Sequence, residues 1–157
     1  MGLAAAAAFV VSTIHFPGPA VPLHLGLYGL LGIVLGGRAF PVLYVCLLFQ
    51  SILLQHGGLL SLGVNSLNMG LGAFVGWRVW KSLPLGSGPR AVAAGFCGAF
   101  LPALLLASEF QMAGYGKGFF VVASAYSVVA GLEAAVTYTA VAFLRRAKPE
   151  ILEPLTG

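Results

Sequence analysis

Residues 39–77 read AFPVLYVCLLFQSILLQHGGLLSLGVNSLNMGLGAFVGW and contain no Asp, Glu, Lys or Arg. Residues 1–37 also lack these four residue types, so Arg38 is the only charged residue before position 78. Two later stretches, 91–108 and 118–144, are equally apolar, and Glu133 is the one charged side chain inside them. A helix needs roughly 20 mainly apolar residues to cross a bilayer. The pattern therefore predicts an all-α integral membrane protein.

The composition of the whole chain agrees with this prediction. Of 157 residues, 59% are hydrophobic and 8% are charged, whereas charged residues make up about 25% of an ordinary soluble domain. The net charge of +4 does not indicate nucleic-acid binding, because the basic residues stand singly or in pairs at the ends of the apolar stretches. We expect residues 1–157 to form a single integral membrane domain with no nucleic-acid partner.

Clusters of Pro and Gly divide the chain into about six expected spans of a polytopic helix bundle. Such breaks include Pro17-Gly18-Pro19, Gly57-Gly58 and the run from Gly86 to Pro89. The first expected span is shorter than a bilayer requires, so either a further helix precedes Met1 or this segment is a half-span inside the bundle. The expected spans cover residues 3–14, 24–36, 39–55, 64–80, 91–108 and 119–144.

The basic residues predict the orientation of the chain in the membrane. Seven of the eight fall at three alternate span ends, and Lys117 is the exception. Because cytoplasmic loops are enriched in Lys and Arg, these ends are expected to be cytoplasmic. The sequence thus predicts a multi-pass protein of the inner (plasma) membrane with a cytoplasmic C-terminus. The seven residues are Arg38, Arg78, Lys81, Arg90, Arg145, Arg146 and Lys148.

All three histidines fall at the opposite, extracytoplasmic span ends: His15, His24 and His56. Neutral imidazole binds nickel, cobalt, copper and zinc well, so each histidine is a candidate metal ligand, with polar contact at the membrane interface as the alternative. Three amide side chains belong to the same layer: Asn65, Asn68 and Gln55. They are expected to hydrogen-bond across the bundle and to support the ligands from outside the first coordination sphere.

Glu133 lies near the middle of the last expected span. An ionisable group at that depth is costly and is a functional candidate by default. Two interpretations stay open for it: a hydrogen-bonding centre within the bundle, or a group that takes part in ion passage or conformational change.

Three segments carry a resemblance to a known family. They are His15-Phe-Pro-Gly-Pro with Leu23-His24-Leu, the region from Gln50 to Gly70, and the region from Leu132 to Leu152. The most specific pattern is Gln-x-Gly-Gly-Leu, Leu-Gly and Asn-x-x-Asn-Met-Gly in residues 55–70. These segments resemble the CbiM/NikM family, the substrate-capture subunits of cobalt and nickel energy-coupling-factor transporters.

The resemblance implies a seven-helix membrane bundle that captures Co²⁺ or Ni²⁺ outside the cell. It also implies three kinds of partner: a small auxiliary membrane protein, a transmembrane coupling subunit and ATPase subunits. ATP hydrolysis would belong to these partners, since the chain has no Gly-x-x-x-x-Gly-Lys-Ser/Thr phosphate loop. The chain itself is expected to be a transporter subunit with no catalytic residues, and His24 matches the family's metal-binding histidine.

The chain departs from the family pattern at several positions. Family members begin Met-His and use that terminus to bind metal, whereas this chain begins Met1-Gly2. His15 and His56 stand where the family usually has Asn and Asp. Three explanations follow: the family's first helix is missing here, the two histidines are substitute ligands, or metal capture is lost. Two other functions stay as alternatives, a metal-free structural paralogue and a histidine-using membrane enzyme or electron carrier.

Overall fold

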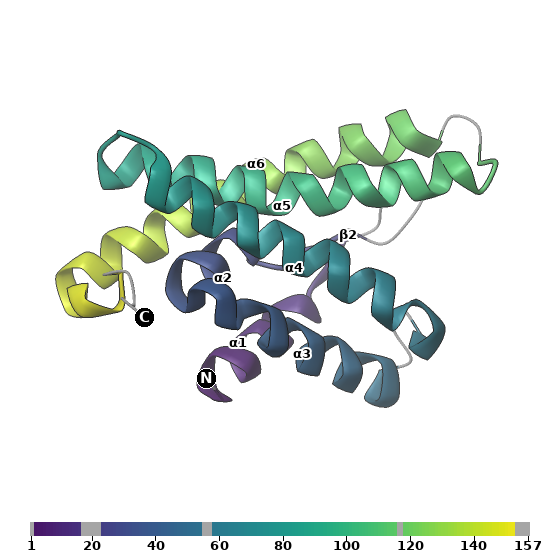
Figure 1. The fold of residues 1–157 in the computed structure, drawn as a ribbon, viewed down its shortest axis with the longest axis horizontal. Helices are drawn as coiled ribbons and strands as arrows, with labels where there is room; N and C mark the ends of the chain where they lie inside the picture. Colours follow the sequence, from purple (N-terminus) through teal and green to yellow (C-terminus); the bar gives the residue numbers. More distant parts are fainter. Residues whose placement is uncertain (1, 17–22, 55–57, 116–117, 153–157) are drawn as a thin grey trace.

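Four long helical runs dominate the computed structural model, which describes residues 2–16, 23–54, 58–115 and 118–152 (Figure 1). Three runs are single helices, α4 (Gly58–Ser82), α5 (Ser87–Met112) and α6 (Gly118–Ala147). The fourth combines α2 (Tyr28–Leu35), the 3-10 turn η1 (Gly36–Arg38) and α3 (Ala39–Leu53). Among the described residues, these four runs are long and apolar enough to cross a membrane. The chain is a polytopic helical membrane protein.

The predicted number of about six spans is wrong. The segments expected at 24–36 and 39–55 fall within one run, Tyr28–Leu53. The segment expected at 3–14 is α1 (Gly2–Ser12), which has 11 residues, and α2 has 8. A helix rises 1.5 Å per residue, so neither can cross a hydrocarbon core of about 30 Å by itself. Both are apolar, but apolar composition does not set the length of a helix.

Gly36 interrupts the helical run between α2 and α3. Its φ of +58° lies in the left-handed region, which glycine adopts without steric cost, and its N–H donates to the carbonyl of Gly32. The chain then turns through η1, and the two helices acquire different neighbours. α2 packs on α4 and α5, whereas α3 packs on α4 and α1.

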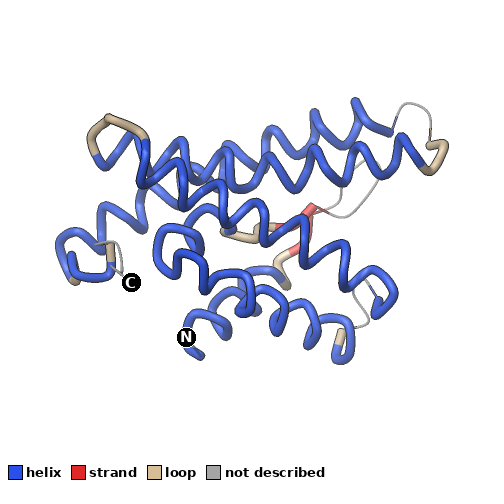
Figure 2. Tube along the Cα trace, viewed as in Figure 1, coloured by secondary structure: helices blue, strands red, loops and turns tan. Residues whose placement is uncertain are grey.

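A short antiparallel ribbon follows α1 and precedes α2, where no strand was expected from the sequence. β1 (His15–Phe16) pairs with β2 (Leu23–His24), as Figure 2 shows in red. The register places the backbone of residue 15 opposite that of residue 24. Two histidines that are separate in the sequence are therefore brought together along the backbone.

Glycine allows the central helices to approach closely. A Cβ atom added at Gly76 of α4 would lie 2.7 Å from the Cα of Gly29 in α2. A Cβ at Gly98 of α5 would meet the same Gly29 Cα at 2.5 Å. Small residues at contacts between membrane helices serve this purpose. Gly72 also faces α5, so the Gly72/Gly76 pair is used for packing within this bundle.

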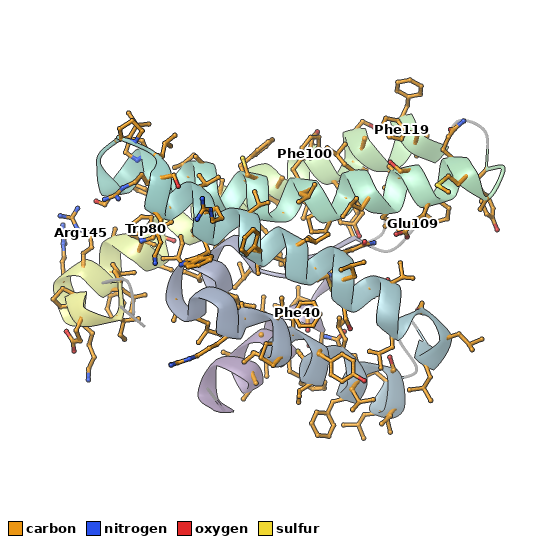
Figure 3. The ribbon with its side chains drawn as sticks, viewed as in Figure 1. Phe40, Trp80, Phe100, Glu109, Phe119 and Arg145 are labelled. Atoms are coloured by element: carbon orange, nitrogen blue, oxygen red, sulfur yellow. The ribbon has the colours of Figure 1, made fainter. Side chains whose placement is uncertain are left out.

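The two ends of the bundle differ in charge. Figure 3 shows Arg145 and Trp80 at one end and Glu109 and Phe119 toward the other. At the basic end, the guanidinium carbon of Arg90 lies 4.7 Å from the ring centroid of Trp80. The last described element, η2 (Pro149–Ile151), also follows α6 at this end.

Large apolar side chains are exposed on the outside of the helices, as expected for contact with lipid. Examples are Leu60, Phe120, Val128 and Phe143.

Candidate functional site

His24 is the last residue of β2, shortly before α2 begins, and its side chain is half-buried. β2 contacts α6, which brings the histidine against the last long helix. There the ring of Tyr126 meets the imidazole edge-on, with centroids 6.5 Å apart and an angle of 84° between the planes. An aromatic edge-to-face contact of this kind favours one ring orientation.

Glu133 lies two helical turns after Tyr126 and therefore on the same face of α6. Its side chain is 1% exposed. The carboxyl Oε1 accepts a hydrogen bond from the backbone N–H of Gly26 at 2.5 Å. The N–H groups of Leu27 and Tyr28 also interact with this carboxyl group. No donor among the described residues meets the geometry of a hydrogen bond to Oε2.

A small cavity joins His24 to these groups, with about 50 Å³ available to the centres of water molecules. A volume of 10–15 Å³ on this measure is enough for one water molecule, so the cavity is large enough for a few waters or an ion. Its lining mixes an imidazole, a carboxyl group, two amides and two phenols with apolar side chains. The polar members are His24, Tyr28, Asn65, Asn68, Tyr126 and Glu133.

The two asparagines of α4 make different hydrogen bonds beside this cavity. Nδ2 of Asn68 donates to Oε1 of Glu109 on α5 at 2.7 Å, which joins two helices. Nδ2 of Asn65 donates to Oγ of Ser61 at 3.2 Å, one turn earlier on its own helix. Asn68 therefore bonds between two helices, whereas Asn65 bonds within its own helix.

The structure brings together only some of the predicted site residues. His24, Asn65, Asn68 and Glu133 line one cavity. The backbone of His15 lies opposite that of His24, and His56 and Gln55 lie outside the described residues. In the part of the chain that is described, no group of three or more His, Cys, Asp or Glu side chains is arranged to hold a metal ion. Among the described residues of these types, His24 and Glu133 line the cavity.

Sequence reasoning missed two parts of the site. Tyr28 is buried in the cavity wall. Its position in the sequence, four residues after His24 and at the start of a helix, could have identified it. The hydrogen bond between Glu133 and the N–H of Gly26 could not be predicted in this way, because every non-proline residue has a backbone N–H. Gln50 on α3 donates a hydrogen bond to Oγ of Ser12 and so joins α3 to α1.

Comparisons with known proteins agree on one family. A family model described as CbiM, cobalt uptake substrate-specific transmembrane region, matches residues 1–151. The cobalt transport protein CbiM of Sorangium cellulosum is 33% identical, over 99% of this chain and 76% of that protein. CbiM of Roseiflexus sp. strain RS-1 is 42% identical, over 53% of this chain and 34% of that protein.

Two further similarities extend the comparison. The fused nickel transport protein NikMN of Rhodobacter capsulatus is 31% identical, over 98% of this chain and 52% of that protein. A crystal structure described as a truncated transition metal transporter has a TM-score of 0.80 and 27% identity, and the match covers 92% of this chain and 78% of that one. The chain spans between 34% and 76% of the length of the three named relatives.

Proposed function

The chain belongs to the CbiM family, the substrate-specific transmembrane region of cobalt uptake, and from this premise we propose that it captures divalent cobalt or nickel for transport. Its relatives carry the names of cobalt and nickel transport proteins. Those names do not favour a membrane enzyme, an electron carrier or a metal-free structural paralogue. The cation is the cargo of the protein, and no catalytic residue is assigned.

The placement of His24 is the observation that supports this proposal. Its imidazole lines a cavity that also contains carboxyl and amide oxygens, and imidazole nitrogen is a good donor for Co²⁺ and Ni²⁺. His15, opposite His24 in the ribbon register, and His56 are proposed as further ligands. Asn65, Asn68 and Gln55 are proposed to hydrogen-bond around the ligands and to hold their orientation. Cobalt and nickel accept the same donors, so the proposal includes both ions.

The direction of capture follows from the charge on the two ends of the bundle. Lys and Arg gather at the end that carries Arg145, which we assign to the cytoplasm together with the C-terminus. The metal would then enter from the outer face of the inner membrane. The family resemblance supports three partners: an auxiliary membrane protein, a transmembrane coupling subunit and ATPase subunits that supply ATP hydrolysis.

The proposal is tested by metal binding to the purified full chain in lipid nanodiscs. Titration calorimetry with Co²⁺, Ni²⁺ and Mg²⁺ should show saturable binding of the first two ions and none of Mg²⁺, which prefers oxygen ligands. His24→Ala should abolish this binding. His15→Ala and His56→Ala, measured separately, should weaken it if those residues are ligands.

One result would refute the site assignment and another the function. If His24→Ala binds Co²⁺ as the unaltered chain does, His24 is not a ligand. If the unaltered chain binds neither Co²⁺ nor Ni²⁺, the chain by itself does not capture these ions.

A further inference from the structure

Helix α2 begins without a capping side chain of its own. The first four N–H groups of any helix lack partners within that helix, and Ser, Thr, Asp or Asn at the N-cap position normally accepts one of them. Here the N-cap residue is Leu27, which has no oxygen in its side chain and makes no capping hydrogen bond. It also adopts left-handed dihedral angles, with φ of 51° and ψ of 33°, which are unfavourable for a residue with a Cβ atom. The segment between His24 and α2 therefore needs support from elsewhere in the fold.

The carboxyl group of Glu133 provides that support from α6. It accepts the N–H of Gly26 at 2.5 Å and interacts with the next two N–H groups, those of Leu27 and Tyr28. Three successive N–H groups converge on one side chain, at the end of α2 where the helix dipole favours a carboxylate. Glu133 thus caps the start of α2 from outside the helix: its partners are the N–H groups of the residue before the N-cap, of the N-cap and of the first helical residue, although it lies 107 residues away from Gly26 in the sequence.

The face of α6 that carries Glu133 also contacts His24. Tyr126, seven residues earlier, meets the imidazole ring edge-on, and Gly26 is only two residues after the histidine. α6 therefore contacts both the side chain of His24 and the backbone that follows it. From these contacts we propose that Glu133 is a positioning residue for metal capture, which acts by holding the turn between His24 and the start of α2 and so fixing the place of His24. This inference rests on the proposed function, because it takes His24 as a metal ligand.

Two measurements on the full chain in nanodiscs test this inference. The first is amide hydrogen exchange of Gly26, Leu27 and Tyr28 without metal, which reports on the cap alone. The second is the visible absorption spectrum and affinity of bound Co²⁺, which report on the ligand geometry at His24. The variants are Glu133→Ala, which removes the acceptor, and Glu133→Gln, which keeps the size of the side chain and one carbonyl acceptor.

Thr137→Val is the matched control for both measurements. Thr137 is as deeply buried as Glu133 and lies one turn later on α6. Its side chain packs beside Gly95 of α5 instead of lining the cavity. The substitution therefore changes a buried polar group of the same helix without touching the cap.

Glu133→Ala should speed exchange of the three amides by about tenfold or more, since a hydrogen bond to a carboxylate is lost. It should also weaken Co²⁺ binding by roughly 10- to 100-fold, the usual effect of losing a group that orients a ligand, and shift the Co²⁺ absorption bands. Glu133→Gln should recover part of both effects. Thr137→Val should change neither, even if it lowers the thermal stability.

Unchanged exchange of the three amides in Glu133→Ala would overturn the cap. Faster exchange with an unaltered Co²⁺ spectrum and affinity would overturn the positioning role. Failure of the proposed function looks different: the unaltered chain would then bind no Co²⁺, while Glu133→Ala would still speed exchange at the start of α2.

Discussion

Nδ2 of Asn68 on α4 donates a hydrogen bond to Oε1 of Glu109 on α5, at 2.7 Å, beside the cavity that contains His24. Asn68 is buried and Glu109 is half-buried, so water replaces this bond poorly. The bond joins two of the long helices on the side of the bundle that faces away from the arginines (Figure 3). Its loss should therefore weaken the contact between α4 and α5.

Asn68→Ala should lower the free energy of unfolding by roughly 1–2 kcal/mol, because the carboxyl group of Glu109 loses its donor. Unfolding in nanodiscs or detergent, followed by circular dichroism, measures the change. Asn65→Ala is the control, since Asn65 bonds only weakly within its own helix at 3.2 Å, and it should cost less. Equal effects of the two substitutions would contradict the assigned role of the bond between helices.

Gly76→Ala should separate α2 from α4, because the new Cβ atom would lie 2.7 Å from the Cα of Gly29. Overpacking of this kind costs about 1–3 kcal/mol. Gly63 on the same helix is the control, since a Cβ added there would meet no neighbouring atom within 4 Å in the described part of the chain. Gly63→Ala should leave the stability unchanged or raise it slightly. Thermal unfolding of the two variants, compared with that of the unaltered chain, measures both effects. If Gly76→Ala were as stable as the unaltered chain, α2 and α4 could move apart without cost.

Gln50 and Ser12 should behave as one unit that holds α1 against α3. The amide of Gln50 donates to the hydroxyl of Ser12, and Gln50 is 4% exposed. Hydrogen bonds between membrane helices contribute about 0.6 kcal/mol on average and up to about 1.7. A double-mutant cycle with Gln50→Ala and Ser12→Ala should return a coupling energy in this range. Additive effects of the two substitutions would mean that the bond contributes nothing to the docking of α1.

Cysteine labelling should report the orientation of the bundle in the inner membrane. In a chain with Cys46→Ala and Cys97→Ala, Met112→Cys places a thiol on an exposed residue at the end of α5. Arg146→Cys places one at the basic end, where α6 finishes. A thiol reagent that does not cross membranes should label the first variant in intact cells and the second only after permeabilisation. The reverse pattern would place His24 toward the cytoplasm and remove the basis for capture from outside.

Local properties of the sequence determined that this chain enters a membrane and where its long helices lie. The uncharged stretch at 39–77 and the apolar bands at 91–108 and 118–144 are long and apolar enough to favour the membrane over water, independently of how the helices pack. Helices α5 and α6 accordingly include the spans expected at 91–108 and 119–144. The family motifs, which are also local, led to the correct family.

The tertiary structure alone decided the lengths of the short helices and the partners of the buried polar groups. Apolar composition suggested separate spans at 3–14 and 24–36, but α1 and α2 are short. The strand His15–Phe16 follows α1, and Gly36 ends α2 with a left-handed φ. The pairing of Glu133 with Gly26 depends on the packing of α6 against β2 and α2, and its donor is a backbone N–H that every non-proline residue possesses. Hydropathy is a sum over residues that are neighbours in the sequence. Such a contact instead depends on the distance between residues far apart in the chain, and that distance is fixed only when the helices pack.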